Sequence, residues 1–124
     1  MADEITYQFQ IQLRNGTLLD SYNNSTLYAN QAAAHLVRNV QQIPFGIGNH
    51  VVLDLGDVAS PGWAMFSNLD STNFVQVGLD VTGTFYPLLQ LELGEQQLVR
   101  LAGVTPYALA DTAAVELFYI IYDT

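Results

Sequence analysis

The chain has 124 residues, of which 50% are hydrophobic and only 12% are charged, so we expect one domain, residues 1–124, with its own core. The net charge is −9 and the three cations are all Arg, which makes nucleic acid and anionic membrane surfaces poor partners. The absence of Cys excludes disulfides and thiolate metal sites, and no motif indicates a cofactor.

The N-terminal segment predicts a β-hairpin. Apolar residues alternate with Thr and Gln from Ile5 to Leu13, a period of two that is typical of a strand with one buried face. Asn15-Gly16 follows directly and favours a type I′ turn, in which both central residues have positive φ. We expect Thr17 to Leu19 to form the returning strand and Asp20 to Ser25 to form a loop.

Residues 26–43 fit two patterns. Apolar residues between Ala33 and Val40 fit one face of a helix, whereas the alternation from His35 to Gln42 fits a strand. The segment has no clear helix cap, so we favour the strand and keep the helix as the alternative. Val51 to Leu55 is the next predicted strand.

From Gly56 onward, short apolar segments alternate with turn signals. Gly and Pro interrupt the apolar pattern, which predicts turns at Pro61-Gly62, Thr82-Gly83 and Gly94-Glu95, and a break at Thr105-Pro106. The strands predicted between these signals are Trp63 to Phe66, Phe74 to Leu79, Thr84 to Leu89 and Gln96 to Leu101.

The last predicted strand, Ala114 to Tyr122, is apolar on both faces. One face carries Val115, Leu117, Tyr119 and Ile121, and the other carries Glu116, Phe118, Ile120 and Tyr122. Such a strand lies in the middle of a covered sheet or faces another subunit. Together, the segments predict an all-β fold, a β-sandwich or jelly roll of about eight to ten short antiparallel strands.

The reactive side chains form no recognisable catalytic motif. His35 and His50 are the only histidines, and no serine lies in a nucleophile-elbow motif. Asp54 and Asp57 flank a glycine without the spacing of a calcium-binding loop. We therefore predict a protein that is not an enzyme and holds no metal or cofactor.

Low charge and aromatic strand faces favour a protein that binds other proteins. A guanidinium can hold a carboxylate with two hydrogen bonds, and aromatic residues are enriched at interfaces. The residues expected at an interface are Arg14, Arg38, Arg100, Trp63, Phe118, Ile120 and Tyr122. As a different class of function, Trp63 with Phe66, Tyr86 and Tyr107 would form a stacking platform of a carbohydrate-binding module.

Several segments of the last two-thirds of the chain resemble small virion proteins of tailed bacteriophages. The pattern consists of Asn68-Leu69-Asp70, Thr72 to Val75, Phe85-Tyr86-Pro87, Gly94-Glu95, and Tyr107 to Val115. The resembling proteins often carry Lys where this chain has Leu93 and Leu109, so contacts made through those lysines are not expected here.

The resemblance implies a capsid cement or decoration protein, found in the virion and in the host cytoplasm during assembly. Its expected partners are the major capsid protein or another virion protein, and further copies of itself in a homotrimer. A head-to-tail adaptor, a tail subunit or a fibre-associated subunit is the alternative within the virion. The N-terminal sequence MADEITYQ does not resemble an export signal.

Overall fold

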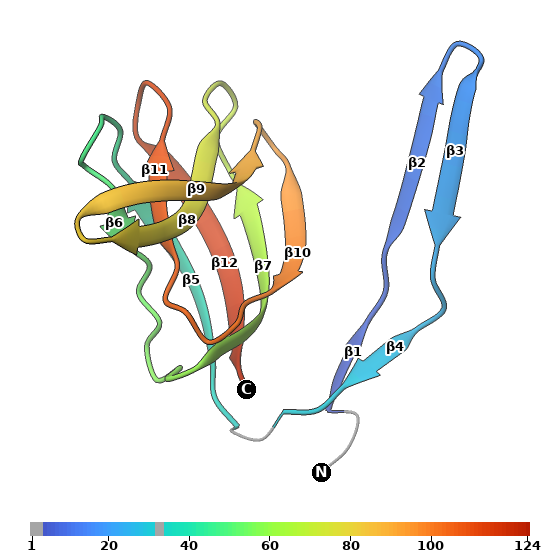
Figure 1. Cartoon of the computed structure of the whole chain (residues 1–124), viewed down its shortest axis with the longest axis horizontal. Helices are drawn as coiled ribbons and strands as arrows, with labels where there is room; N and C mark the ends of the chain where they lie inside the picture. The colour runs from blue at the N-terminus through green and yellow to red at the C-terminus, as the bar shows by residue number, and fades with distance from the viewer. Residues whose placement is uncertain (1–3, 32–33) are drawn as a thin grey trace. The chain divides into compact units, whose positions relative to one another are not determined.

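A computed structural model describes residues 4–31 and 34–124, and every regular element in these two ranges is a β-strand (Figure 1). The predicted all-β class is therefore confirmed. The chain divides into two compact units, Met1–Ala32 and Ala33–Thr124. We predicted one sandwich domain over residues 1–124, whereas the strands of the sandwich all belong to the second unit.

The first unit is a two-stranded ribbon, which we call the arm (residues 4–31). β1 (Ile5–Tyr7) pairs with β4 (Leu27–Ala29), and β2 (Gln10–Asn15) pairs with β3 (Leu18–Asn23), in both cases antiparallel. The predicted hairpin is thus present, but its turn is centred on Gly16-Thr17. Gly16 has a φ of 59° and Thr17 does not have a positive φ, so the turn is type II′ rather than type I′.

The strand predicted from Ile5 to Leu13 is interrupted at Gln8 and Phe9. Asn24 engages both backbone polar groups of Phe9. Its Oδ1 accepts a hydrogen bond from the Phe9 N–H (2.7 Å), and its own N–H donates to the Phe9 carbonyl (3.3 Å). A side-chain oxygen therefore replaces a backbone carbonyl in the ladder, and the regular pairing stops there.

The arm has one apolar face, defined here as Phe9, Ile11, Leu13, Leu18 and Tyr22. Ile11 lies opposite Tyr22, whose ring centroid is 5.9 Å from that of Phe9, and Leu13 and Leu18 continue the same face along the ribbon. All five side chains are exposed. The predicted burial of one face of residues 5–13 holds for Ile5, but it was wrong for Phe9, Ile11 and Leu13, because a two-stranded ribbon supplies no second layer to cover them.

The second unit is a β-sandwich of two four-stranded sheets, with strand orders β10-β7-β12-β5 and β6-β11-β8-β9. Neighbouring strands within each sheet are antiparallel. The strands are β5 (Leu36–Ile43), β6 (Val51–Val52), β7 (Pro61–Asn68), β8 (Val75–Val81), β9 (Thr84–Leu91), β10 (Gln96–Arg100), β11 (Tyr107–Ala110) and β12 (Val115–Asp123).

These bounds test two local predictions and add one strand that was not predicted. Within residues 26–43 the structure has β4 and β5 and no helix in the described part, so the favoured strand was correct; residues 32–33 lie outside the described ranges. Pro61-Gly62 starts β7 instead of forming a turn, and the Gly62 carbonyl accepts a hydrogen bond from the Leu101 N–H. Strand β11 was not predicted.

The core lies between the two sheets and joins buried side chains from both. β12 runs between β7 and β5, the mid-sheet position that was one of the two alternatives predicted for a strand apolar on both faces. Its inner residues Val115, Leu117, Tyr119 and Ile121 are fully buried. They pack in one cluster with Phe66, Val75, Val77, Leu91 and Ala108, among others.

Candidate interaction surface

Because side chains alternate along a strand, Phe118, Ile120 and Tyr122 of β12 point away from the core. The register places Phe118 between Val40 and Ser67, and Ile120 between Arg38 and Met65. Tyr122 lies opposite Leu36. On the other side of β7, Leu98 lies opposite Met65 and Arg100 opposite Trp63.

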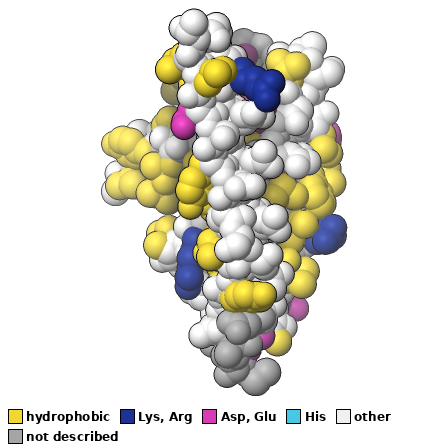
Figure 2. Space-filling view, turned by 90° about the vertical axis from the view of Figure 1, so that its right-hand side faces the viewer, with side chains coloured by type: hydrophobic (Ala, Val, Ile, Leu, Met, Phe, Trp, Pro, Cys, Tyr) yellow, Lys and Arg dark blue, Asp and Glu magenta, His cyan; other side chains and the backbone are white. Residues whose placement is uncertain are grey.

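We call this surface the outer apolar face. Leu36, Val40 and Leu98 are exposed, and the remaining hydrophobic members are partly buried. Figure 2 shows one side of the molecule, where hydrophobic side chains gather in exposed patches and charged side chains are few. The hydrophobic members of the outer apolar face are Leu36, Val40, Trp63, Met65, Leu98, Phe118, Ile120 and Tyr122.

Two arginines lie over aromatic rings of this face. The Arg38 Cζ atom is 5.9 Å from the centroid of the Phe118 ring, and the Arg100 Cζ atom is 5.8 Å from the Trp63 ring. These distances are within the range of cation–π attraction, which holds each guanidinium against the sheet. The hydrogen-bond donors of both arginines are therefore presented next to an apolar surface.

Six of the seven residues predicted at an interface lie on the outer apolar face: Arg38, Arg100, Trp63, Phe118, Ile120 and Tyr122. The seventh, Arg14, belongs to the arm, where it lies opposite Leu19 on the face that does not carry Ile11. The prediction did not include Leu36, Val40, Met65 and Leu98, which also lie on this face. The period-two pattern contained the signal, but only the strand order shows that these positions share one side of one sheet.

The proposed aromatic platform for sugars is not assembled. Trp63 and Phe66 are on opposite sides of β7, and Phe66 is fully buried in the core. Tyr86 is exposed on β9 of the other sheet, whereas Tyr107 packs edge-on against His50. These four side chains do not share one surface.

His50 has the more enclosed of the two imidazole rings. Its Nε2 is 3.0 Å from Asp80 Oδ2, the ring stacks on Phe85, and no hydrogen bond reaches its buried Nδ1. The hydrogen bond from His50, followed by that from the Gly83 N–H, lowers the pKa of Asp80. Among the described residues no hydroxyl group bonds His50; the pair with Asp80 fixes the β8–β9 turn and does not resemble a catalytic triad.

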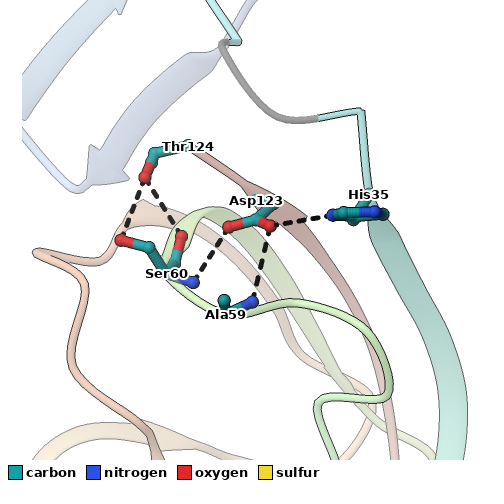
Figure 3. A network of polar contacts seen from close by, with 5 residues as sticks. All are labelled: His35, Ala59, Ser60, Asp123 and Thr124. Carbon is teal, nitrogen blue, oxygen red and sulfur yellow. Dashed lines mark hydrogen bonds and ion pairs between the residues drawn. The ribbon is translucent and has the colours of Figure 1, made fainter.

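His35 lies in a second cluster, shown in Figure 3. Asp123 is buried and accepts hydrogen bonds from the backbone N–H groups of Ser60 (2.9 Å) and Ala59 (3.4 Å), and its Oδ2 is 3.2 Å from His35 Nδ1. The Thr124 hydroxyl donates to Ser60. The cluster ties the end of β12 to the segment before β5 and to the loop before β7.

The Asn-Leu-Asp motif has a structural role in the turn after β7. Asp70 accepts hydrogen bonds from the backbone N–H groups of Asn73 (2.6 Å) and Thr72 (3.0 Å), which lower its pKa. Asn68 is buried and bonds three carbonyl groups. The hydrogen bonds of Asn68 and Asp70 therefore stabilise the backbone of this turn.

An apolar groove of about 290 Å³ opens between the two sheets, lined by Val77, Leu79, Leu89, Val99, Val104 and Pro106, among others. The titratable pairs at His50 and His35 are not part of its lining. Within residues 4–31 and 34–124, no three His, Asp or Glu side chains lie close enough to hold a metal ion, and no helix could cross a bilayer.

No protein-family model, curated protein or solved structure matches this chain. The arrangement described above can bind an apolar partner surface and pair with carboxylates through Arg38 and Arg100. The outer apolar face is therefore the best candidate for a functional surface in the part of the chain that the structure describes.

Proposed function

We propose that this protein is a non-enzymatic structural subunit of a tailed-phage virion, a capsid decoration protein that binds its neighbours through the outer apolar face. The observation that carries the proposal is the composition of that face. Trp, Tyr and Arg are the residue types that dominate binding energy at interfaces, and here Trp63, Tyr122, Arg38 and Arg100 occur on one sheet.

An exposed apolar face favours aggregation of an isolated domain, and in an assembly the same face contributes binding energy when a neighbour covers it. Burying a large apolar side chain that was exposed contributes about 1.5–3 kcal/mol. Leu36, Val40 and Leu98 are the exposed members that gain most from being covered. Arg38 and Arg100 add specificity, because a guanidinium held on a ring can form paired hydrogen bonds with a carboxylate.

The choice of a phage shell as the assembly rests on the resemblance of the segments from Asn68 to Val115 to small virion proteins. A protein that binds only the assembled shell stabilises it by about 3–4 kcal/mol per site when its concentration exceeds Kd about a hundred- to a thousandfold. We propose a trimer, since a symmetric partner makes several equivalent contacts around a local threefold axis.

Two variants with the same chemical change test the surface. Val40 and Val81 are both 49% exposed, but Val40 lies on the outer apolar face and Val81 at the end of β8 in the other sheet. Rebinding to stripped virions of the encoding phage is measured by co-sedimentation. Val40→Glu should weaken rebinding about tenfold or more, whereas Val81→Glu should rebind like the wild type.

The same virions test the identity of the assembly. Mass spectrometry of washed particles should detect the chain in many copies, and electron microscopy should place it on the outer shell. Sixfold or twelvefold rings at the neck would show an adaptor instead. Absence from washed particles would overturn the proposal.

A further inference from the structure

The arm lacks a layer that covers its apolar side. A ribbon of two strands is marginally stable in water unless it packs against another surface. The five side chains of its apolar face are nevertheless all exposed, and they follow one side of β2 and β3 without interruption by a cation. The opposite face carries Gln10, Gln12, Ser21, Asn23 and Arg14, with Leu19 as its exposed apolar residue.

The charges of the arm and of the outer apolar face are complementary. Asp20, opposite Leu13, is the charged residue on the apolar side of the β2–β3 ladder, whereas Arg14 is on the other side. The outer apolar face carries Arg38 and Arg100, and Glu116 is the acidic residue at its strand positions. A weakly acidic apolar ribbon therefore matches a weakly basic apolar sheet, although the whole chain has a net charge of −9.

The length of the arm is also sufficient to cross the outer apolar face. The six-residue strands β2 and β3 extend over about 20 Å, and four strands spaced by ~4.8 Å span about 14 Å. Burying ~100 Å² from each of the five apolar side chains of the arm, with a similar area of the sheet, gives about 1,000 Å² for one docked arm. Two arms exchanged between two copies bury about 2,000 Å², within the range of stable complexes.

We propose that the arm of one copy docks, through Phe9, Ile11, Leu13, Leu18 and Tyr22, on the outer apolar face of a second copy. The inference rests on the proposed function, because it names the partner of the same surface. Each copy gives one arm and receives one, so the exchange closes a ring of identical subunits. The arm acquires the second layer that a ribbon needs, and the sheet acquires a cover.

The solution mass of full-length variants, measured by light scattering over a range of concentrations, tests the proposal. Ile11 and Leu19 are isomeric side chains, 66% and 67% exposed, on opposite faces of the arm. Ile11→Glu and Val40→Glu should each raise the dissociation constant of the oligomer about tenfold or more. Leu19→Glu and Val81→Glu should leave it unchanged. Circular dichroism checks that every variant remains folded.

The four variants separate the two proposals. Dissociation by Val40→Glu but not by Ile11→Glu would overturn arm docking and leave the outer apolar face as a binding surface. If Ile11→Glu and Val40→Glu each left the oligomer intact, both arm docking and the proposed role of the outer apolar face would be contradicted. A wild-type monomer at all concentrations would overturn arm docking, while rebinding of that monomer to stripped virions would keep the proposed function.

Because the chain has no Cys, single cysteines can report the contact directly. An Ile11→Cys chain is mixed with a Val40→Cys chain and treated with a short bismaleimide crosslinker. A mixed dimer is expected, and it should be absent when Leu19→Cys replaces Ile11→Cys or Val81→Cys replaces Val40→Cys. Equal crosslinking in all mixtures, or none in the first, would contradict docking between copies.

Discussion

Asn68 shows how much of this fold depends on single polar side chains. Its Nδ2 group donates to the carbonyls of Asn73 (2.9 Å), Leu91 (3.1 Å) and Glu92 (3.2 Å), and its Oδ1 accepts from the Asp70 N–H. One buried amide therefore connects the end of β7, the following turn and the end of β9.

Asn68→Asp should lower the free energy of unfolding by about 3 kcal/mol or more at neutral pH. The substitution places a carboxylate against three carbonyl oxygens and removes the amide donor that they share. Urea denaturation measures the loss. Asn15→Asp, at the exposed turn of the arm, is the control and should change stability by less than about 0.5 kcal/mol.

Asp123 connects stability to pH. Hydrogen bonds from the Ser60 backbone above all, and from His35 and Ala59, lower the pKa of its carboxyl group below the ordinary value of 3.8. A group with a lower pKa in the folded state stabilises the fold above its unfolded pKa, and this contribution is lost as the pH falls through the folded pKa. The pKa values of Asp70 and Asp80 are also lowered, so these carboxyl groups likewise stabilise the fold at neutral pH and lose this contribution in acid.

The urea midpoint of the wild type should therefore fall as the pH drops below about 4. Asp123→Asn should lower stability at pH 7 and make the acid-induced fall smaller, because one titrating contribution is removed. Asp57→Asn, at an exposed loop position, is the matched control. An acid profile of Asp123→Asn parallel to that of the wild type would show that this carboxyl does not contribute.

At the scale of elements, the β8–β9 hairpin shows what a glycine inside a strand does. The pairing shifts between Val77 and Gly78, so that Leu88 of β9 has no direct partner. A Cβ atom on Gly78 would collide with the Tyr86 carbonyl oxygen and lie 2.8 Å from the Pro87 Cα. The close backbone approach allows this bulge, and Pro87 is accommodated on an edge strand.

Gly78→Ala should destabilise the sandwich by about 1–3 kcal/mol, since β9 must move away from β8 to admit the methyl group. Thermal unfolding measures the loss, and amide exchange should accelerate in β9 more than in β12. Gln76→Ala, two residues earlier on β8, should stay within about 0.5 kcal/mol of the wild type. Equal stability of Gly78→Ala and Gln76→Ala would contradict the packing argument.

At the scale of the whole molecule, the two units differ in how they are stabilised. The sandwich has a core drawn from both sheets, and a pair of exposed apolar surfaces remains, one on the arm and one on the sandwich. If each surface covers the other in a neighbouring copy, the arm gains stability by mass action. The sandwich has its own core, so its stability depends little on the second copy.

Amide hydrogen exchange should therefore depend on protein concentration in the arm alone. We expect exchange in β2 and β3 to slow by about tenfold or more between dilute and concentrated protein, because only the docked ribbon is stabilised. Amides of β7 and β12 should exchange at the same slow rate throughout. Slow, concentration-independent exchange in β2 and β3 would contradict a role for a second copy.

Alternation and turn residues predicted most of the strands in advance. The hairpin of the arm, the Thr82-Gly83 and Gly94-Glu95 turns and the central position of β12 follow from local pattern. Strand β11 was missed because Tyr107 to Ala110 is short and lies between turn signals, so its pairing with β8 and β6 decides its conformation. Pro61-Gly62 was assigned to a turn because Pro and Gly are turn signals, whereas its hydrogen bonds with the segment that follows β10 make it the start of β7.

Local pattern in the sequence was enough for the all-β class, for most of the strands and for the residue types suited to an interface, because period-two alternation and glycine conformation are local properties. The position of Arg38, Trp63, Arg100 and Ile120 on one face follows from the strand order, since this order brings together residues that are far apart in sequence. The same reason applies to the arm. Its alternation predicted a buried face, but burial depends on a second layer, which a two-stranded ribbon does not contain.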